Sequence, residues 1–199
     1  MTDDDKALVR TRALTVGYTG SPVAKVPDLN LAGGVVWHVT GANGSGKTAL
    51  LKTLAGLIPP VTGNVERRCN IGAGGAIYIH PVPYLFAGTV IRNLTLADPS
   101  PHEIDRVMRL FELEPLQERD VRALSYGEQR RVALARAVAS RPAVLLVDES
   151  DAGLDEAAHV SWWTYVAGAV ADGAPALVVA AHRLLPCDGV PIREIHLRA

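Results

Sequence analysis

A glycine-rich stretch at residues 41–48 has the residue types and spacing needed to bind phosphate. Its sequence, Gly-Ala-Asn-Gly-Ser-Gly-Lys-Thr, fits the pattern of a glycine, four residues and then Gly-Lys-Ser/Thr. Glycines let the backbone curl so that successive N–H groups point at phosphate oxygens. Lys47 would place its charge on the β and γ phosphates of a nucleotide, and the Thr48 hydroxyl can ligate Mg²⁺. An ordinary glycine-rich turn is the alternative interpretation.

The flanking segments predict that this loop lies at the start of a helix. Residues 35–40 are rich in β-branched types and predict a strand, whereas residues 48–54 predict a helix. The macrodipole at a helix N-terminus favours bound anions, which suits a phosphate loop. We therefore expect nucleotide contacts from Gly41, Asn43, Gly44, Ser45, Gly46, Lys47, Thr48 and Ala49.

Two carboxylates about one hundred residues later could complete such a site. Asp148 and Glu149 follow residues 143–147, an apolar run with β-branched members that is typical of a central parallel strand. The carboxyl ends of parallel strands are where α/β proteins bind ligands. Asp148 could orient Mg²⁺ or its water, and Glu149 could polarise an attacking water as general base. Alone, the pattern is also typical of a surface turn.

A third pattern, at residues 124–130, opens a helix that is rich in arginine and alanine. Ser125 and Glu128 have the spacing of a capping box. In the simpler interpretation, Ser125 only caps the helix. In the functional interpretation, the Ser125 hydroxyl and the Gly127 N–H face a phosphate.

Together these motifs resemble those of the ATP-binding-cassette (ABC) ATPases, the nucleotide-binding subunits of ABC transporters. Residues 41–48 are similar to the family's Walker A loop, and residues 124–128 to its LSGGQ signature. Residues 143–149 match Walker B with its catalytic glutamate, and residues 150–155 resemble the D-loop. The resemblance covers residues 18–182, with the motifs in the family's order.

The resemblance implies roles for further residues. Tyr18 would stack on the adenine of ATP, although a loop tyrosine with a buried ring is the alternative. His182 would contact the γ-phosphate and would join Glu149 and Lys47 as a catalytic residue. In the family, two subunits pair head to tail and share each ATP. The residues expected to contact ATP from the second subunit are Ser125, Gly127, Glu128 and Asp155.

Two positions depart from the family's pattern. The family places a glutamine that touches Mg²⁺ after a short strand, but here residues 76–79 are followed by His80. A neutral His80 could still accept a hydrogen bond or ligate metal weakly. In the signature, Tyr126 replaces a glycine, and Glu128 also departs from the pattern. The expected metal ligands are Thr48 and Asp148, with His80 as a further candidate.

The elements that must position these residues alternate along the chain, which indicates an α/β parallel sheet. Strand patterns occur at residues 8–16, 35–40, 61–66, 76–79, 143–147 and 176–180, and helical patterns at 48–54, 101–113, 127–140 and 156–171. With the resemblance, they predict a P-loop NTPase with a parallel-sheet core, an N-terminal antiparallel β part and a short helical insertion at about 81–140. We expect one ABC ATPase domain over residues 1–199.

The composition limits the class of protein. The net charge of −1 argues against a general nucleic-acid-binding surface, so no nucleic-acid partner is expected. Cys69 and Cys187 lack metal-ligand spacing and are typical of reduced thiols. Residues 1–6 are acidic, unlike a signal peptide, and glycines and prolines interrupt the uncharged stretch 69–91. We expect a cytoplasmic protein, held at the inner face of the membrane through a partner.

The resemblance thus implies an Mg²⁺-dependent ATPase that energises a transmembrane permease subunit as a homo- or heterodimer. Residues 84–86, Tyr-Leu-Phe, could face that membrane subunit or pack beneath the helical insertion. The alternatives are a soluble non-transport ABC ATPase, a nucleotide-dependent switch with little turnover, and a P-loop kinase. The kinase alternative leaves residues 124–130 unexplained.

Overall fold

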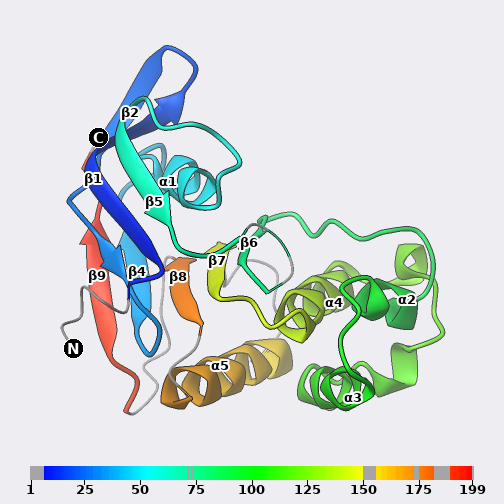
Figure 1. Ribbon diagram of the computed structural model, residues 1–199. Coiled ribbons are helices and arrows are strands. Elements are labelled where there is room, and N and C mark those ends of the chain that lie inside the picture. Colours follow the sequence, from blue (N-terminus) through cyan, green and yellow to red (C-terminus); the bar gives the residue numbers. More distant parts are fainter. Residues whose placement is uncertain are drawn as a thin grey trace.

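An antiparallel sheet and a parallel sheet lie side by side in the computed structural model (Figure 1). The structure describes residues 7–70, 72, 74–149, 156–172, 175–181 and 189–198, without the side chains of 156–158. Helix α1 (Lys47–Leu54) contacts strands of both sheets. The phosphate loop that precedes this helix is therefore held between them.

The antiparallel sheet is built on β1 (Val9–Tyr18), which pairs with three strands: β2 (Ser21–Lys25), β3 (Asn30–Leu31) and β5 (Thr62–Arg67). The register between β1 and β5 shifts after Arg12. At this irregularity a Cβ on Gly63 would lie 2.4 Å from the Ala13 oxygen, so only glycine permits the close approach. The antiparallel part expected at the N-terminus is present.

The parallel sheet has the strand order β6-β7-β8-β4-β9. Its strands are β6 (Ala76–Ile79), β7 (Val144–Asp148), β8 (Ala176–Ala180), β4 (Val36–Thr40) and β9 (Ile192–His196). Every residue of β7 and β8 is buried, as expected for strands covered on both faces. The sequence patterns missed β2, β3 and β9, which are short or polar and depend on pairing with longer strands.

The segment between β6 and β7 holds three helices: α2 (Val90–Thr95), α3 (Pro101–Leu110) and α4 (Tyr126–Ala139). Two 3₁₀ turns, Glu114–Leu116 and Val121–Ala123, lie between α3 and α4. Each α-helix begins at a hydroxyl side chain that accepts a backbone N–H: Thr89, Ser100 and Ser125. This is the helical insertion that the sequence predicts.

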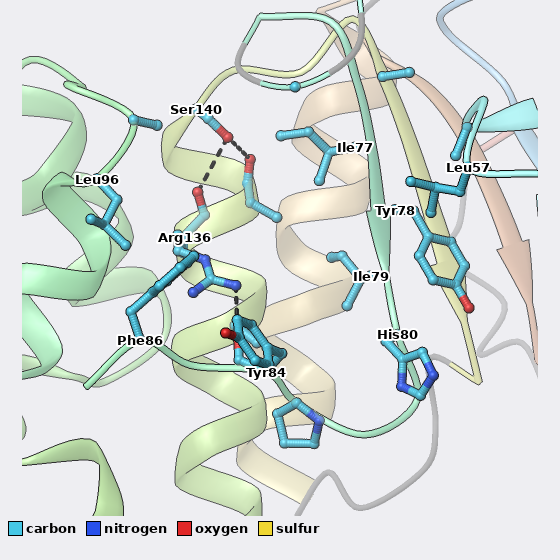
Figure 2. A pocket seen from close by; sticks show the side chains of 17 residues that line it. Leu57, Ile77, Tyr78, Ile79, His80, Tyr84, Phe86, Leu96, Arg136 and Ser140 are labelled. Atoms are coloured by element: carbon cyan, nitrogen blue, oxygen red, sulfur yellow. Dashed lines mark hydrogen bonds between the residues drawn. The ribbon is translucent and has the colours of Figure 1, made fainter. Parts of the chain in front are cut away.

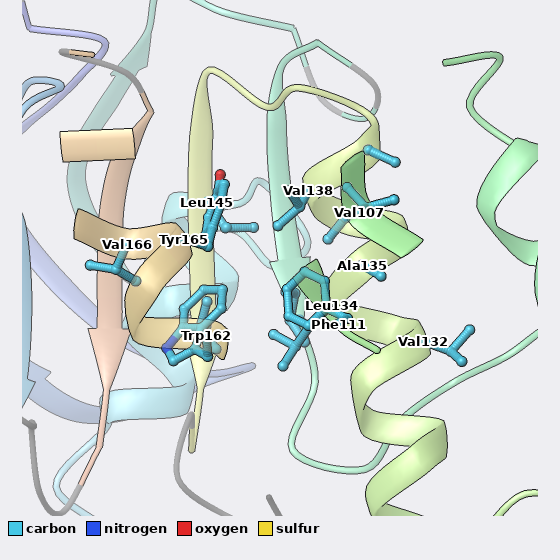
Figure 3. Close-up of a cluster of buried hydrophobic side chains, with 14 of the residues drawn as sticks. Val107, Phe111, Val132, Leu134, Ala135, Val138, Leu145, Trp162, Tyr165 and Val166 are labelled. Carbon is cyan, nitrogen blue, oxygen red and sulfur yellow. The ribbon is translucent and has the colours of Figure 1, made fainter. Parts of the chain in front are cut away.

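One apolar core joins the insertion to the parallel sheet (Figure 3). Phe111 at the end of α3, Leu134 of α4, Leu145 of β7 and Trp162 of α5 (Glu156–Ala171) are all fully buried in it. Because these side chains come from four elements, the start of α4 has a fixed place relative to the end of β7. No helix in the described part of the chain is long and apolar enough to cross a bilayer.

Candidate active site

Three glycines give the phosphate loop its shape. Gly41, Gly44 and Gly46 have φ angles of 143°, 81° and 96°, in the region that side chains disfavour. A Cβ on Gly41 would lie 2.5 Å from the Ser45 Oγ and 2.6 Å from the Leu197 oxygen. The loop can therefore turn this tightly only with glycine at that position.

The start of α1 differs from the starts of the insertion helices. Its N-cap is Gly46, which offers no side-chain acceptor, so the first-turn amides are available to an anion. The Lys47 ammonium donates to the oxygens of Gly41 and Ala42, at 2.8 and 3.0 Å. The Ser45 Oγ is buried and finds no hydrogen-bond partner among the described residues. These donors suit a phosphate group.

A cavity of about 350 Å³ brings together candidate residues that are distant in the sequence. Tyr18, at the end of β1, and Glu149, after β7, line it together with the phosphate loop. The loop and helix residues that line it are Asn43, Gly44, Gly46, Lys47, Thr48 and Ala49. The Tyr18 ring is half exposed, so it is available for stacking and is not a core residue.

The end of β7 presents its two carboxylates in different surroundings. Asp148 is buried, and its Oδ2 accepts a hydrogen bond from the Tyr78 hydroxyl at 2.9 Å. Burial and the neighbouring Asp148 raise the pKa of Tyr78, so the phenol stays protonated and donates. Glu149 is exposed and has a φ of 50°, a left-handed conformation. Tyr78 has no local signature in the sequence, because its partner lies on the adjacent strand.

The oxygen ligands here suit Mg²⁺. Thr48 offers a hydroxyl beside the cavity, and Asp148 a carboxylate at the end of β7. The described residues contain no group of three or more His, Cys, Asp or Glu side chains that could hold a metal. Proteins hold Mg²⁺ through one or two side chains, while phosphates and water complete the shell.

Ser125 caps α4 with the capping box that the spacing predicts. Its Oγ accepts the Glu128 N–H at 3.3 Å, and its own N–H donates to the Glu128 Oε2 at 2.7 Å. These hydrogen bonds hold the pKa of Glu128 below its ordinary value. Ser125 is exposed, and no described residue of 124–128 lines the cavity around Lys47 of the same chain.

The remaining candidates lie away from the loop cavity or outside the described residues. His80 is exposed, and its Nδ1 accepts the Val82 N–H at 3.0 Å. It does not line the loop cavity but borders a separate groove. His182 and Asp155 lie outside the described residues.

The groove beside His80 has a volume of about 580 Å³ and is mostly apolar (Figure 2). Ile77 and Ile79 of β6 point toward α4 in Figure 2, and no described lining residue is acidic. The side chains of Tyr84 and Phe86 are 69% and 47% exposed at its rim. The Arg136 guanidinium stacks on the Phe86 ring at 5.2 Å and donates to the Tyr84 oxygen at 2.8 Å, which fixes the rim.

The comparison with known proteins identifies the family to which this site belongs. A family model described as ABC transporter matches residues 25–152. The chain belongs to the ABC transporter family. A cytochrome c biogenesis ATP-binding export protein (CcmA) of Bordetella bronchiseptica is 39% identical over 170 residues, covering 78% of this chain and 75% of that protein. A zinc import ATP-binding protein (ZnuC) of Ruegeria sp. is 31% identical over 181 residues, covering 89% and 72%.

A solved structure agrees with the fold of this ABC ATPase. It is a dimeric ATP-binding cassette in a post-hydrolysis state, bound to ADP and Pi. The TM-score is 0.75 at 22% identity, with 88% of each chain covered. The expectation of a P-loop ATP-binding subunit that hydrolyses ATP to energise a transporter is thereby confirmed. One relative is named for import and the other for export, so cargo and direction differ within the family.

Proposed function

We propose that this ABC ATPase hydrolyses Mg²⁺-ATP in a head-to-tail dimer and energises a separate transmembrane permease. The observation that carries the catalytic part is the cavity shared by Tyr18, Lys47, Thr48 and Glu149. This cavity brings together the groups that a nucleotide hydrolase needs. They are an aromatic ring for adenine, a cation and backbone amides for phosphate, and a carboxylate base.

In this proposal, ATP lies with adenine on Tyr18 and its phosphates over the loop amides. Lys47 leaves the loop carbonyls for the β and γ phosphates and stabilises the charge that develops on them. Bound Mg²⁺ would neutralise phosphate charge, with Thr48 and Asp148 as its protein ligands. Glu149 takes a proton from water as the water oxygen bonds to the γ-phosphorus and the bond to ADP breaks. ADP and inorganic phosphate are the products.

The position of α4 supports the proposed dimer. Ser125 is exposed at a helix N-terminus yet lies outside the loop cavity of its own chain. A second copy paired head to tail would bring Ser125, Gly127 and Glu128 to the γ-phosphate from the opposite side. Asp155 would contact the same interface, and His182 the γ-phosphate. The Ser125 hydroxyl accepts the capping bond and can still donate its own hydrogen.

His80 is a further candidate metal ligand in this proposal. Its ring lies 6.2 Å from the Tyr78 ring, and Tyr78 binds Asp148. His80 is thus one side chain removed from the proposed Mg²⁺ ligand. It also borders the apolar groove, which is where we propose that the permease binds. This partner would hold the ATPase at the inner face of the membrane.

Replacing Glu149 tests the proposed reaction. We expect Glu149→Gln to lower turnover by about 100-fold or more, because the general base is lost. ATP should still bind, and the ATP-bound dimer should accumulate in size-exclusion chromatography. Phosphate release and nucleotide affinity are measured on the same preparations. Unchanged turnover would refute Glu149 as the base, and a monomer with ATP bound would refute the dimer.

A further inference from the structure

Arg130, in the second turn of α4, is fully buried and reaches two separate segments of backbone. Its Nη2 donates to the backbone carbonyl oxygens of Asp148 and Glu149, each at 3.1 Å. Its Nη1 donates to the oxygens of His80 and Pro81, the latter at 3.1 Å. No described carboxylate forms an ion pair with it, so these carbonyls compensate a buried charge that would otherwise be costly. Its Nε finds no hydrogen-bond partner among the described residues.

The Nη2 arm acts on the backbone of Glu149. The φ and ψ angles of Glu149 set the relative position of the two carbonyls to which this nitrogen donates. With φ at 50°, Glu149 has a conformation that costs about 1–3 kcal/mol for a residue other than glycine and persists only where the surroundings hold it. The two bonds from Arg130 supply such a constraint and so fix the direction in which the Glu149 side chain leaves β7.

The Nη1 arm ties the same guanidinium to the end of β6. Pro81 accepts a second bond from the same helix, since the Tyr126 hydroxyl donates to its oxygen at 3.0 Å. A guanidinium is planar and rigid, so the two segments cannot shift independently while all four bonds persist. A lysine ammonium has three donors on one nitrogen and could not form all four of these bonds.

We propose that Arg130 is a positioning residue for hydrolysis, which holds Glu149 in the orientation needed to activate water. The inference rests on the proposed function, in which Glu149 is the general base. It adds that catalysis depends on a side chain outside the nucleotide cavity. A base displaced by about 1 Å can lose about 100-fold in rate while substrate binding is unaffected.

The test compares Arg130→Lys and Arg130→Gln with the wild type in the full chain. We expect kcat to fall by about 10- to 100-fold, while ATP affinity changes by less than about 2-fold. Single-turnover rates in a Glu149→Gln background should show no further loss, because the base being positioned is already absent. Turnover is normalised to the fraction of protein that binds nucleotide, which separates catalysis from partial unfolding.

The adjacent Arg131 provides a matched control. It donates to the Phe111 oxygen at 3.3 Å, and its side chain is only 13% exposed, but it does not touch β7. Arg131→Lys should keep kcat within about 2-fold. The proposal would be overturned if Arg130→Lys and Arg131→Lys lowered kcat equally. It would also be overturned if the Arg130 variants caused their full loss of rate in the Glu149→Gln background.

A surface variant keeps the test usable if buried Arg130 cannot be replaced. Tyr126→Phe removes the other bond to Pro81 from a side chain that is 46% exposed, and we expect a smaller loss of kcat. Full turnover in Tyr126→Phe, together with unfolding of both Arg130 variants, would assign Arg130 to stability alone. If Glu149→Gln itself retains turnover, the proposed function fails. If only the Arg130 variants retain it, this inference alone fails.

Discussion

At the scale of single residues, two carbonyls of the phosphate loop hold the Lys47 ammonium in a fixed position. Its ammonium is held 2.8 and 3.0 Å from two loop oxygens, beside first-turn amides that no side chain caps. A phosphate entering the loop would exchange these neutral acceptors for a charged one. An ammonium is attracted more strongly by an ionised phosphate oxygen than by a neutral carbonyl, so the exchange favours the nucleotide.

We therefore expect Lys47→Ala to weaken ATP binding by about 10- to 100-fold, the equivalent of one charged hydrogen bond. Lys52→Ala is the matched control, since it removes the same charge from the last turn of the same helix. Titration with a fluorescent ATP analogue measures both. Equal affinities for the two variants would contradict the assignment of Lys47 to the phosphates.

At the scale of elements, Glu103 ties α3 to the segment that joins α4 to β7. Its side chain is 3% exposed, and each carboxylate oxygen accepts from a different arginine, Arg106 at 3.0 Å and Arg141 at 3.0 Å. Arg141 lies between the end of α4 and the start of β7. The contact therefore steadies the connection that leads into β7, which ends at Asp148.

We expect Glu103→Gln to lower the free energy of unfolding by about 1–3 kcal/mol, because two charged hydrogen bonds are weakened at a buried position. Glu112→Gln is the control, since its side chain is 62% exposed and its contact with Arg131, at 3.7 Å, is of the weak surface kind. Urea denaturation at neutral pH measures both variants. A Glu103→Gln midpoint equal to the wild type would show that the contact adds nothing.

The Glu103 carboxylate should also make the free energy of unfolding depend on pH in the acidic range. Burial opposes ionisation of Glu103, but the hydrogen bonds from Arg106 and Arg141 outweigh it and lower its pKa in the folded protein. The unfolded chain then binds more protons, so this stability is present above the unfolded pKa of about 4.3 and is lost as pH falls through the folded pKa. Between about pH 5 and pH 3, the wild type should lose more unfolding free energy than Glu103→Gln.

At the scale of the whole molecule, the adjacent strands β6 and β7 connect the apolar groove, which β6 borders, with the nucleotide cavity, which Glu149 borders at the end of β7. Tyr78 of β6 borders the groove and binds Asp148, and Arg130 joins the end of β6 to Glu149. A partner seated in the groove would therefore lie one side chain away from the proposed catalytic carboxylates.

We expect Tyr84→Asp to reduce sedimentation of the ATPase with native membranes by about 10-fold, because it places a charge at the rim of an apolar interface. Turnover of the isolated protein should not change, since Tyr84 is 69% exposed and does not line the loop cavity. Val160→Asp, at a 57% exposed valine of α5, is the control. Equal sedimentation of both variants would remove the groove as the binding site.

Much of this protein can be derived from its residue order. Glycine spacing, apolar runs and the capping box encode local backbone conformation, so the phosphate loop, β7 and the start of α4 were all predictable. The order of the motifs was enough to indicate the family. These features depend on neighbours within a few residues, which is the range over which sequence patterns carry information.

Only the tertiary structure decided which distant groups meet. Tyr78 and Asp148 are 70 residues apart, and Arg130 lies 50 residues from one of its carbonyls and 19 from another. Strand β9 is recognisable only beside β4. Such contacts depend on strand order and on the core that fixes α4 against the sheet, and neither has a local signature in the chain.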